Sequence, residues 1–442
     1  MQQTDNATMS TPRASVILVI LALINMLNFF DRTIIAVVFE PIRKEFGLND
    51  LQLGIAGAAF TVVYAVAGIP LGRIADTSSR KNLLGIGLTA WSLLTAASGL
   101  VWNYISLLLV RMGLGIGEAS CAPAATSMIG DLYPAEKRAR AMGVFMLGLP
   151  IGLVLAFFTI GPIVQAFGSW RAPFFAAAVP GLILAIVVFL IREPQRGASE
   201  KHQVSEEKID KPVRKILSIK TMWWIILSGV SVNFAAYAGN GFLVALLLRY
   251  YQLPIADASI ITGGIVGVTG LIGLTLGGHL SDSIHKRSET GRLTYGAVCL
   301  LIASIAIFAA LKQGQGALTL FSVLFGLGWL TYYSYYTTVY PALQDVVQPK
   351  LRGTAMALYF AGMYLLGGAF GTVVVGGLSD YFANAAMIAE GVAVMNDTHR
   401  AIGLHDAMYL IPVAMLITAV FVFLATKTFK ADHKAMLDEL ER

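Results

Sequence analysis

Apolar stretches of about 20 residues recur from one end of this chain to the other, and they leave few folds open to it. One α-helix needs about 20 apolar residues to cross a hydrocarbon core of roughly 30 Å. Charged residues make up only 13% of the chain and apolar residues 56%, which is too little polar surface for a water-soluble protein. We therefore predict an all-α membrane protein with twelve transmembrane helices. The helices are expected at 15–40, 51–75, 82–101, 104–131, 139–167, 171–191, 222–249, 256–283, 293–311, 316–345, 353–382 and 404–426.

Basic residues are distributed unequally between the connections of these helices. By count, 24 Lys and Arg residues lie in both tails and in the connections after the even-numbered helices, and 6 lie in the other connections. Basic connections remain in the cytoplasm, so we expect both termini to be cytoplasmic. This pattern accounts for the net charge of +6 without a nucleic-acid partner.

The two ends of the sequence predict whether the first helix is retained and in which membrane the protein lies. No small-residue cleavage site follows the first apolar stretch, so we expect it to be retained as a helix rather than removed as a signal peptide. The tails are short and carry no sorting signal, which favours a bacterial inner membrane. We expect a monomer in the lipid bilayer.

One long polar segment divides the helices six and six. We expect an N-terminal six-helix bundle at 1–191, a cytoplasmic linker at 192–220 and a C-terminal six-helix bundle at 221–442. Within the linker, residues 211–220 fit either a short helix on the membrane surface or a solvated segment.

The two halves repeat each other. GIPLGRIADTSSRK in the first half matches LTLGGHLSDSIHKR in the second at an offset of 206 residues, and a further match follows at an offset of 214. Parallel repeats of this kind occur in transporters whose substrate site lies at the repeat interface. The pairs used below are Asp76 with Asp282, Asp131 with Asp345, and Arg138 with Arg352.

Several motifs resemble those of the major facilitator superfamily. GRIADTSSRK is similar to that family's loop between helices 2 and 3, RMGLGIGEA to its motif in helix 4, and FGSWRAPF and IREP to the segments that flank helix 6. The resemblance covers nearly the whole chain and implies two six-helix bundles that transport by alternating access. NFFDRTIIAVVFEPI, GLPIG and the segment that begins GIGEASCAPAATS most resemble the Spinster branch. That branch is associated with export of lysophospholipids and sphingolipid phosphates.

Ionisable residues inside predicted spans are candidates for function, because each costs several kcal/mol in a bilayer. Arg111 and Glu118 are seven residues apart, so they lie on one helical face with roughly 10 Å of rise between them. Asn28 and Asp31 form part of a polar stripe on the first helix. We expect Asp31 to pair with Arg111 and Glu118 to lie deeper toward the substrate. We assign proton coupling to Asp31, Glu118 and Arg111.

These charged residues leave alternatives open. A permanent salt bridge between Asp31 and Arg111 could serve only to join two helices. Arg111 also suits an anionic headgroup, since a guanidinium binds phosphate in bidentate fashion. Arg32 is one position from Asp31, which directs it about 100° away and fits snorkelling or a role in the gate.

The second half has no counterpart to these charges. Under the offset of 214, Glu118 aligns with Tyr332, and the tenth predicted helix carries a run of tyrosines. We expect a cavity with a charged wall from the first half and an apolar, hydroxyl-bearing wall from the second, which suits an amphiphile with an anionic head. Helix packing with an interfacial aromatic belt is the alternative for the tyrosines. The expected substrate-binding residues are Asn28, Arg32, Arg111, Glu118, Asn233, Tyr237, Asn240, Tyr332 and Tyr336.

The cytoplasmic loops are the expected gate. In the family that the chain resembles, the Asp and Arg of the first loop motif latch the halves in the outward-facing state, and the matching residues are Asp76 and Arg80. Asp131 is the expected partner, and Asp282 and Asp345 repeat the arrangement in a copy whose basic cluster is displaced.

Small residues in the fifth helix predict a close helix contact and a kink, at Gly143, Gly148, Pro150 and Gly152. A similar Gly-Pro pattern marks antiporters of the resembling family and leans toward export, although ordinary packing explains it equally well.

The sequence thus favours a proton-coupled secondary transporter that exports an amphiphilic lipid, with that lipid, protons and the bilayer as its partners. A carrier of small organic anions or drugs is the alternative, and a non-transporting receptor or a scramblase is the alternative of another class. An enzyme is least favoured, since no metal-ligand spacing, phosphate-binding loop or nucleophile motif is present. We expect no cofactor beyond the proton gradient, and no function follows for the external segment 384–403.

Overall fold

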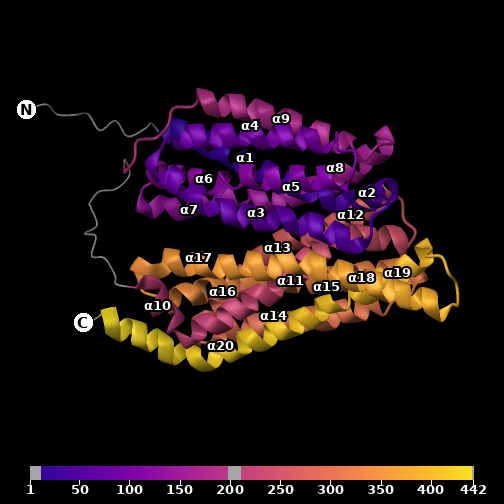
Figure 1. Ribbon diagram of the computed structural model, residues 1–442. Coiled ribbons are helices and arrows are strands. Elements are labelled where there is room, and N and C mark those ends of the chain that lie inside the picture. The colour runs from indigo at the N-terminus through magenta and orange to yellow at the C-terminus, as the bar shows by residue number, and fades with distance from the viewer. Residues whose placement is uncertain (1–10, 198–210, 441–442) are drawn as a thin grey trace, which may run out of the picture. The chain divides into compact units, whose positions relative to one another are not determined.

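The computed structural model describes residues 11–197 and 211–440, and all regular structure in these ranges is helical (Figure 1). Eleven helical stretches of the described chain are long and apolar enough to cross a membrane. The remaining predicted span, 82–101, is α4 (Arg80–Ser98), a helix of 19 residues whose first turn is polar. The prediction of an all-α protein with membrane-spanning helices is confirmed.

The chain packs into two compact units, and the first consists of residues 11–38 and 62–197 of the described chain. Within this unit α4 lies along α9, and α1 lies along α8 (Figure 1). Its helices are α1 (Thr11–Val37), the second part of α3 (Asp50–Thr77), α4 (Arg80–Ser98), α5 (Tyr104–Glu118), α6 (Cys121–Leu132), α7 (Ala135–Met146), α8 (Gly148–Phe167) and α9 (Ala172–Leu190).

Glycines hold α8 against α1. A Cβ added at Gly148 would lie 2.7 Å from the backbone nitrogen of Met26, and one added at Gly152 would lie 2.3 Å from its carbonyl oxygen. Only glycine fits at such distances, so the predicted close contact of the fifth span is confirmed at Gly148 and Gly152. It is wrong at Gly143, where an added Cβ would meet no atom within 4 Å. The same span is interrupted at Leu147, between α7 and α8.

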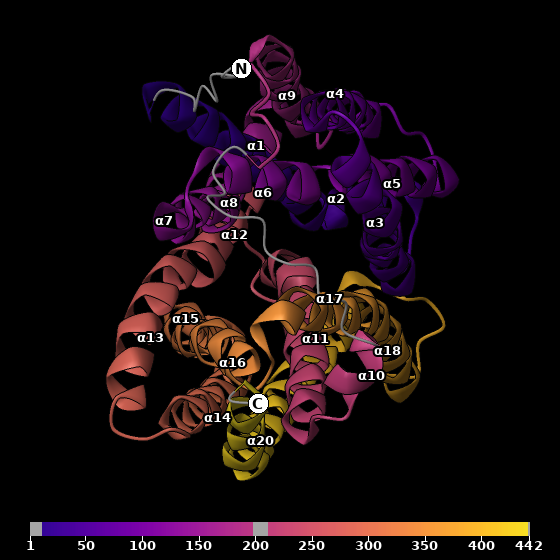
Figure 2. The same ribbon diagram turned by 90° about the vertical axis from the view of Figure 1, so that its left-hand side faces the viewer.

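The second unit consists of residues 39–61 and 211–440 of the described chain. Within it α14 and α11 each pack along α20, and α14 also packs against α15 and α16 (Figure 2). Its elements are α2 (Phe39–Phe46), the first part of α3, α10 (Pro212–Leu217), α11 (Lys220–Arg249), α12 (Ile255–Thr262), η1 (Gly263–Val268), α13 (Thr269–His285), α14 (Gly291–Leu311), η2 (Gln315–Ala317), α15 (Leu318–Tyr332), α16 (Ser334–Asp345), η3 (Pro349–Leu351), α17 (Arg352–Gly362), η4 (Met363–Gly368), α18 (Ala369–Ala389), α19 (Asp397–Ala407) and α20 (Leu410–Leu440).

The units differ from the predicted domains in one segment. Residues 39–61 pack with the second unit, although they precede the polar segment that divides the sequence. Of the two options for 211–220, the structure has the short helix α10, while residues 198–210 of the predicted linker lie outside the described residues. The division at 192–220 stays a prediction.

The same interruption occurs in one spanning helix of each unit. α5 has 15 residues and is followed after two residues by α6, which has 12. α15 also has 15 residues and is followed after one residue by α16, which has 12. At the offset of 214, Tyr104 aligns with Leu318 and Glu118 with Tyr332, so the first pieces of both helices begin and end at equivalent positions. The repeat in the sequence is therefore a repeat in the backbone.

The external segment 384–403 is more ordered than the sequence indicates. α18 continues to Ala389 and α19 begins at Asp397, so only seven residues between them are not helical. Asn396 and His399 cap the start of α19 reciprocally, each side chain bonding the other's backbone N–H, which accounts for the helix. α20 also continues to Leu440, beyond its expected end at 426.

Candidate functional site

The first unit buries a cluster of ionisable side chains where α5 ends. Asn28 and Asp31 come from α1, and Arg111 and Glu118 come from α5. Each of these four residues is at most 4% exposed. The polar stripe of the first helix and the charged face of the fourth predicted span therefore meet inside one unit, as their spacing indicated.

The ion pair of this cluster joins Arg32 to Glu118. The guanidinium Nε of Arg32 donates to Glu118 Oε2 at 2.7 Å, and Asn28 Nδ2 donates to the same oxygen at 3.2 Å. The guanidinium also lies over the ring of Tyr64, 4.1 Å from its centroid. We expected Arg32 to point away from the other charges, and this was wrong. The direction of its Cα–Cβ bond does not fix the head of so long a side chain, which reaches back to a buried carboxylate.

Asp31 is held by a neighbour that the sequence did not suggest. Its Oδ2 accepts a hydrogen bond at 3.3 Å from Thr95 Oγ1 of α4, whereas we expected its partner to be Arg111 of α5. Asp31 Oδ1 and Glu118 Oε1 are buried and have no hydrogen-bond partner among the described residues. Each carboxylate therefore has one satisfied oxygen and one that the described protein leaves open to a proton, a water molecule or a ligand.

Tyrosines occupy the equivalent place in the second unit. The hydroxyl groups of Tyr332 and Tyr336 are hydrogen-bonded to each other. A second chain of bonds runs from Ser228 of α11 to Tyr335 and on to Tyr359 of α17, with 2.9 Å between successive oxygens. These hydroxyl groups satisfy one another without any charge. The sequence indicated Tyr332 and Tyr336 but not Ser228 or Tyr359, which come from other helices and carry no recognisable motif.

The predicted residues of α11 have different roles in the structure. Asn233 donates from Nδ2 to the carbonyl oxygen of Met363 at 2.8 Å, so its amide satisfies the backbone at the start of the π-helical segment η4. The ring of Tyr237 meets that of Tyr364 edge to face. Asn240 Oδ1 is buried without a hydrogen-bond partner among the described residues. Of the three, Asn240 has the clearest unused polar atom.

The first loop motif forms a latch within the first unit. The guanidinium of Arg80, only 1% exposed, contacts Asp131 and Glu193 and donates to the carbonyl oxygen of Pro194 at 2.7 Å. The predicted contact between Arg80 and Asp131 is thus present in the structure, while its role in gating stays a prediction. Asp76 is exposed and makes no hydrogen bond or ion pair with the described residues.

Glu193 is a member of this latch that we did not predict, although it lies in the IREP segment. Its carboxylate accepts from Ser79 Oγ and from the backbone nitrogen of Arg80 at 2.9 Å. Partial burial raises the pKa of Glu193, but the hydrogen bonds from Ser79 and Arg80 outweigh it and hold the pKa below its ordinary value.

The second copy of the latch is centred on a different basic residue. Arg292 of α14 donates to Asp282 at 3.2 Å and to Asp345 at 3.4 Å. The two repeated Asp residues therefore do share a partner, but that partner comes from after the loop rather than from the displaced basic cluster. Asp282 is 71% exposed, so this copy is more open to water than the first.

A further ionic cluster lies within the second unit and was not predicted. Arg249 donates to Glu40 at 2.6 Å and to Asp50 at 2.7 Å and 2.8 Å. Ser379 donates to Asp50, and Arg43 joins Glu40 to Asp397. The sequence indicated only Arg43 and Arg249, as external basic residues, because the partners in this cluster are up to 354 positions apart. The cluster ties α2 and the start of α3 to α11, α18 and α19.

The described residues offer no group of three or more His, Cys, Asp or Glu side chains placed to hold a metal ion. Both cysteines, Cys121 and Cys299, are buried free thiols. The polar chemistry of the described chain is therefore that of carboxylates, guanidinium groups, amides and hydroxyl groups.

Comparison with known proteins places this arrangement among transporters. Residues 21–372 match the model of the Major Facilitator Superfamily. An MFS-type efflux pump of Mycolicibacterium smegmatis is 28% identical over 97% of this chain and 96% of its own length. Protein spinster homolog 1 of Xenopus laevis is 28% identical over 84% of this chain and 74% of its own length.

A solved structure agrees with these sequence relatives. The crystal structure of a bacterial homologue of the human lysosomal transporter Spinster, in an inward-facing and unoccupied conformation, is 28% identical to this chain. It matches with a TM-score of 0.86 over 96% of this chain and 99% of its own.

Proposed function

Because the chain belongs to the Major Facilitator Superfamily, we propose that it is a proton-coupled secondary active transporter that exports an amphiphilic lipid by alternating access. The substrate class is a lysophospholipid or a sphingolipid phosphate, with one anionic headgroup and an apolar chain. The similarity to Spinster proteins supports the lipid class, and the similarity to an efflux pump supports export. The bacterial inner membrane, with both termini cytoplasmic, is the location that the basic residues favour.

The observation that carries this proposal is the pair of buried carboxylates, each with one oxygen that lacks a hydrogen bond. A salt bridge with a purely structural role satisfies both oxygens, because a buried polar atom without a partner is costly. Asp31 and Glu118 instead keep Oδ1 and Oε1 open inside a membrane-spanning unit. A carboxylate of this kind can exchange a proton when its surroundings change, which is what coupling requires.

The proposed roles follow from the contacts within each unit. Asp31, bonded to Thr95, carries the proton, and Glu118, bonded to Arg32, is the second coupling carboxylate. Arg111, two helical turns from Glu118 on the same helix, binds the anionic headgroup. Within the second unit, Tyr332 and Tyr336 are further proposed substrate-binding residues, since their rings and hydroxyl groups suit an amphiphile.

The gate belongs to the same proposal. Arg80 holds Asp131 and Glu193 inside the first unit, while Asp76 beside it stays exposed and without a partner among the described residues. Asp282 and Asp345 share Arg292 in the second unit. The exposed Asp76 and Asp282 are the carboxylates available to form and release contacts during the transport cycle.

The test is flux of a fluorescent lysophospholipid in proteoliposomes, read by back-extraction with albumin from the outer leaflet, with and without an imposed proton gradient. Wild type and the exposed-carboxylate control Asp257→Asn should show gradient-dependent flux, and Asp31→Asn should lose it. Asp257 is exposed and lies in α12, outside the charged cluster. Gradient-dependent flux that persists in Asp31→Asn would rule out Asp31 as the proton carrier.

A carrier of small organic anions or drugs is the second candidate, and the efflux-pump relative favours it. Such a carrier would use Arg111 and the same carboxylates but would not need an apolar chain. No lysophospholipid flux from folded wild type, together with gradient-driven flux of an aromatic monoanion, would replace the lipid proposal with this one.

A further inference from the structure

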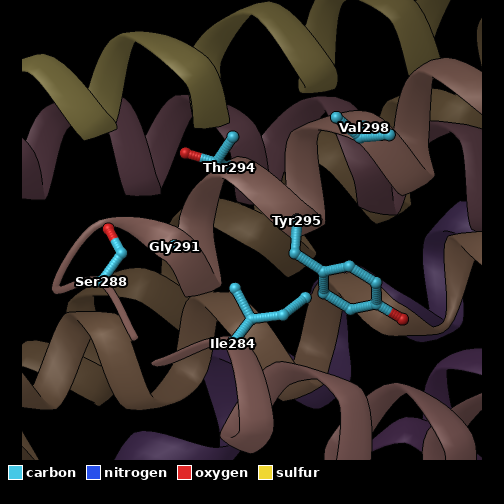
Figure 3. Close-up of a pocket in the computed structure, with 6 residues that line it drawn as sticks. All are labelled: Ile284, Ser288, Gly291, Thr294, Tyr295 and Val298. Atoms are coloured by element: carbon cyan, nitrogen blue, oxygen red, sulfur yellow. The ribbon is translucent and has the colours of Figure 1, made fainter. Parts of the chain in front are cut away.

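The second unit carries two separate shallow pockets on one face of α14, which together we call the groove. A pocket of about 350 Å³ lies at the start of this helix and is lined by Ile284, Ser288, Gly291, Thr294, Tyr295 and Val298 (Figure 3). A second pocket of about 260 Å³ is lined by Ile302, Ile305, Ala306, Ala309, Leu324 and Leu327. At about 100° per residue, the α14 residues of both pockets fall on one face of roughly 120°. The two pockets therefore follow each other along the same side of the helix.

The groove changes from polar to apolar along α14. Ser288 lies in the loop before the helix, and Figure 3 shows Thr294 and Tyr295 on one turn of α14 and Val298 further along it. Beyond Val298 every lining residue of the second pocket is aliphatic, and Ile305 is 62% exposed. Because α14 is one of the spans, such exposed aliphatic side chains face lipid.

Basic residues lie at the polar end of the groove. Lys286 and Arg287 are exposed, two and one positions before Ser288, and form no ion pair with the residues that the structure describes. Arg292 is already engaged by Asp282 and Asp345. The positive end of the α14 dipole lies at the same place and adds to the attraction for an anion. Glu289 is the one acidic residue of this loop.

The dimensions suit one leaflet of a bilayer. From Gly291, where α14 begins, to Ile302 the helix rises about 16 Å at 1.5 Å per residue, which is about half of a hydrocarbon core of roughly 30 Å. An acyl chain lying on this face would therefore reach the middle of the membrane while its headgroup stays at the loop.

We propose that this groove holds one resident bilayer phospholipid with an anionic headgroup. Lys286 and Arg287 bind its phosphate, and one acyl chain lies along α14 over Val298 and Ile302. The polarity gradient and the unpaired basic residues together select such a lipid over an apolar partner helix. This lipid is distinct from the transported substrate, and the site does not depend on the proposed function.

The test is native mass spectrometry of the full chain released from detergent micelles that contain either phosphatidylglycerol or phosphatidylcholine. Wild type should retain one phosphatidylglycerol in preference to phosphatidylcholine. Each basic residue near a membrane surface contributes about 1 kcal/mol of attraction to anionic lipid, so Lys286→Gln/Arg287→Gln should weaken retention of phosphatidylglycerol by roughly 30-fold. All of the changed side chains are exposed, so the variants should fold.

Two further variants distinguish the contribution of the lipid headgroup to binding from that of the acyl chain. Lys427→Gln/Lys430→Gln removes the same charge from exposed positions of α20 and should leave retention unchanged. Val298→Trp, at a position 50% exposed, should fill the groove and weaken retention of both lipids. Equal loss in both charge variants would mean only diffuse attraction, and full retention in Val298→Trp would mean that a free anion fits as well as a lipid; either result overturns the proposal.

Discussion

The two units use the same interrupted helix for opposite chemistry. In the first unit, α5 ends at Glu118, which is buried with Arg32, Asn28 and Asp31 around it. In the second, α15 ends at the equivalent Tyr332, whose neighbours are uncharged rings and hydroxyl groups. The interruption of the helix is repeated in both units, whereas the ionisable groups occur only in the first.

This difference between the two units shows that only the first unit carries the energetic cost of buried charge at this position. An ionisable group in a bilayer is expensive, and a network of neutral hydroxyl groups that bond one another can occupy the equivalent position at lower cost. The second unit shows that the fold does not need charges at this position. Charges retained at the equivalent position of the first unit therefore point to a task other than folding, and proton coupling is the task that we propose.

The largest expected loss of stability comes from changing the charged residue at the helix interruption of the first unit. Glu118→Gln removes the carboxylate that Arg32 contacts at 2.7 Å, and breaking a buried ion pair on one side costs about 3 to 5 kcal/mol. The free energy of unfolding, measured by denaturant titration in detergent, should fall by about this amount. The double variant Arg32→Gln/Glu118→Gln should recover part of the loss, because no buried charge then remains unbalanced. A single variant as stable as wild type would contradict the pairing.

Two glycine substitutions test whether both units use the same close helix packing. A Cβ at Gly152 would lie 2.3 Å from the carbonyl oxygen of Met26, and one at Gly367 would lie 2.3 Å from that of Val230. Gly152→Ala and Gly367→Ala should each lower the free energy of unfolding by about 1 to 3 kcal/mol, the usual cost of overpacking. Gly143→Ala and Gly264→Ala, where no atom lies within 4 Å, are the matched controls. Tolerance in one unit alone would show that the repeat does not extend to packing.

Substitution at the tyrosine interruption of the second unit should lower the free energy of unfolding less than substitution at the charged interruption of the first. Tyr332→Phe removes one hydroxyl and its bond to Tyr336, so the free energy of unfolding should fall by about 1 kcal/mol. The same denaturant titration checks this value against that of Glu118→Gln. If Tyr332→Phe costs as much as Glu118→Gln, the contrast between the units is not one of charge.

The smallest effect concerns the latch of the first unit. Since the pKa of Glu193 lies below its ordinary value of about 4.3, its contribution is complete above that pH and is lost as the pH falls through the lower folded-state value. A spin label at Gln195→Cys should be immobile at pH 7 and gain mobility in acid below pH 4. Both native cysteines are buried and should not react. In a Glu193→Gln background the label should already be mobile at pH 7, and an immobile label there would exclude Glu193 from the latch.

Hydropathy and small-residue spacing predicted most of the fold. The eleven spans found in the described chain and the contact of Gly148 and Gly152 with the first helix follow from local patterns, because lipid and close helix packing act on each segment separately. The order within 384–403 was missed, since the cap between Asn396 and His399 is only evident once α19 is seen.

The buried ionisable cluster was predicted in membership, whereas the bond of Arg32 to Glu118 and that of Thr95 to Asp31 were missed. The cost of charge in a membrane was enough to single out Asp31, Arg32, Arg111 and Glu118. Which of them touch depends on long side chains and on a third helix, α4, whose Thr95 is marked by no sequence pattern. The same reason hides Glu193 and Arg249, whose partners lie more than 100 residues away in the chain.

The central claim is that coupling resides in the charged break of the first unit and not in the aromatic break of the second. Proton movement on addition of lysophospholipid, followed with a pH-sensitive dye inside proteoliposomes, tests it most directly. Asp31→Asn should abolish the proton signal while substrate exchange without a gradient continues, whereas Tyr332→Phe/Tyr336→Phe should keep the number of protons per substrate and change only substrate affinity. A wild-type proton signal in Asp31→Asn, or its loss in the tyrosine variant alone, would contradict the account.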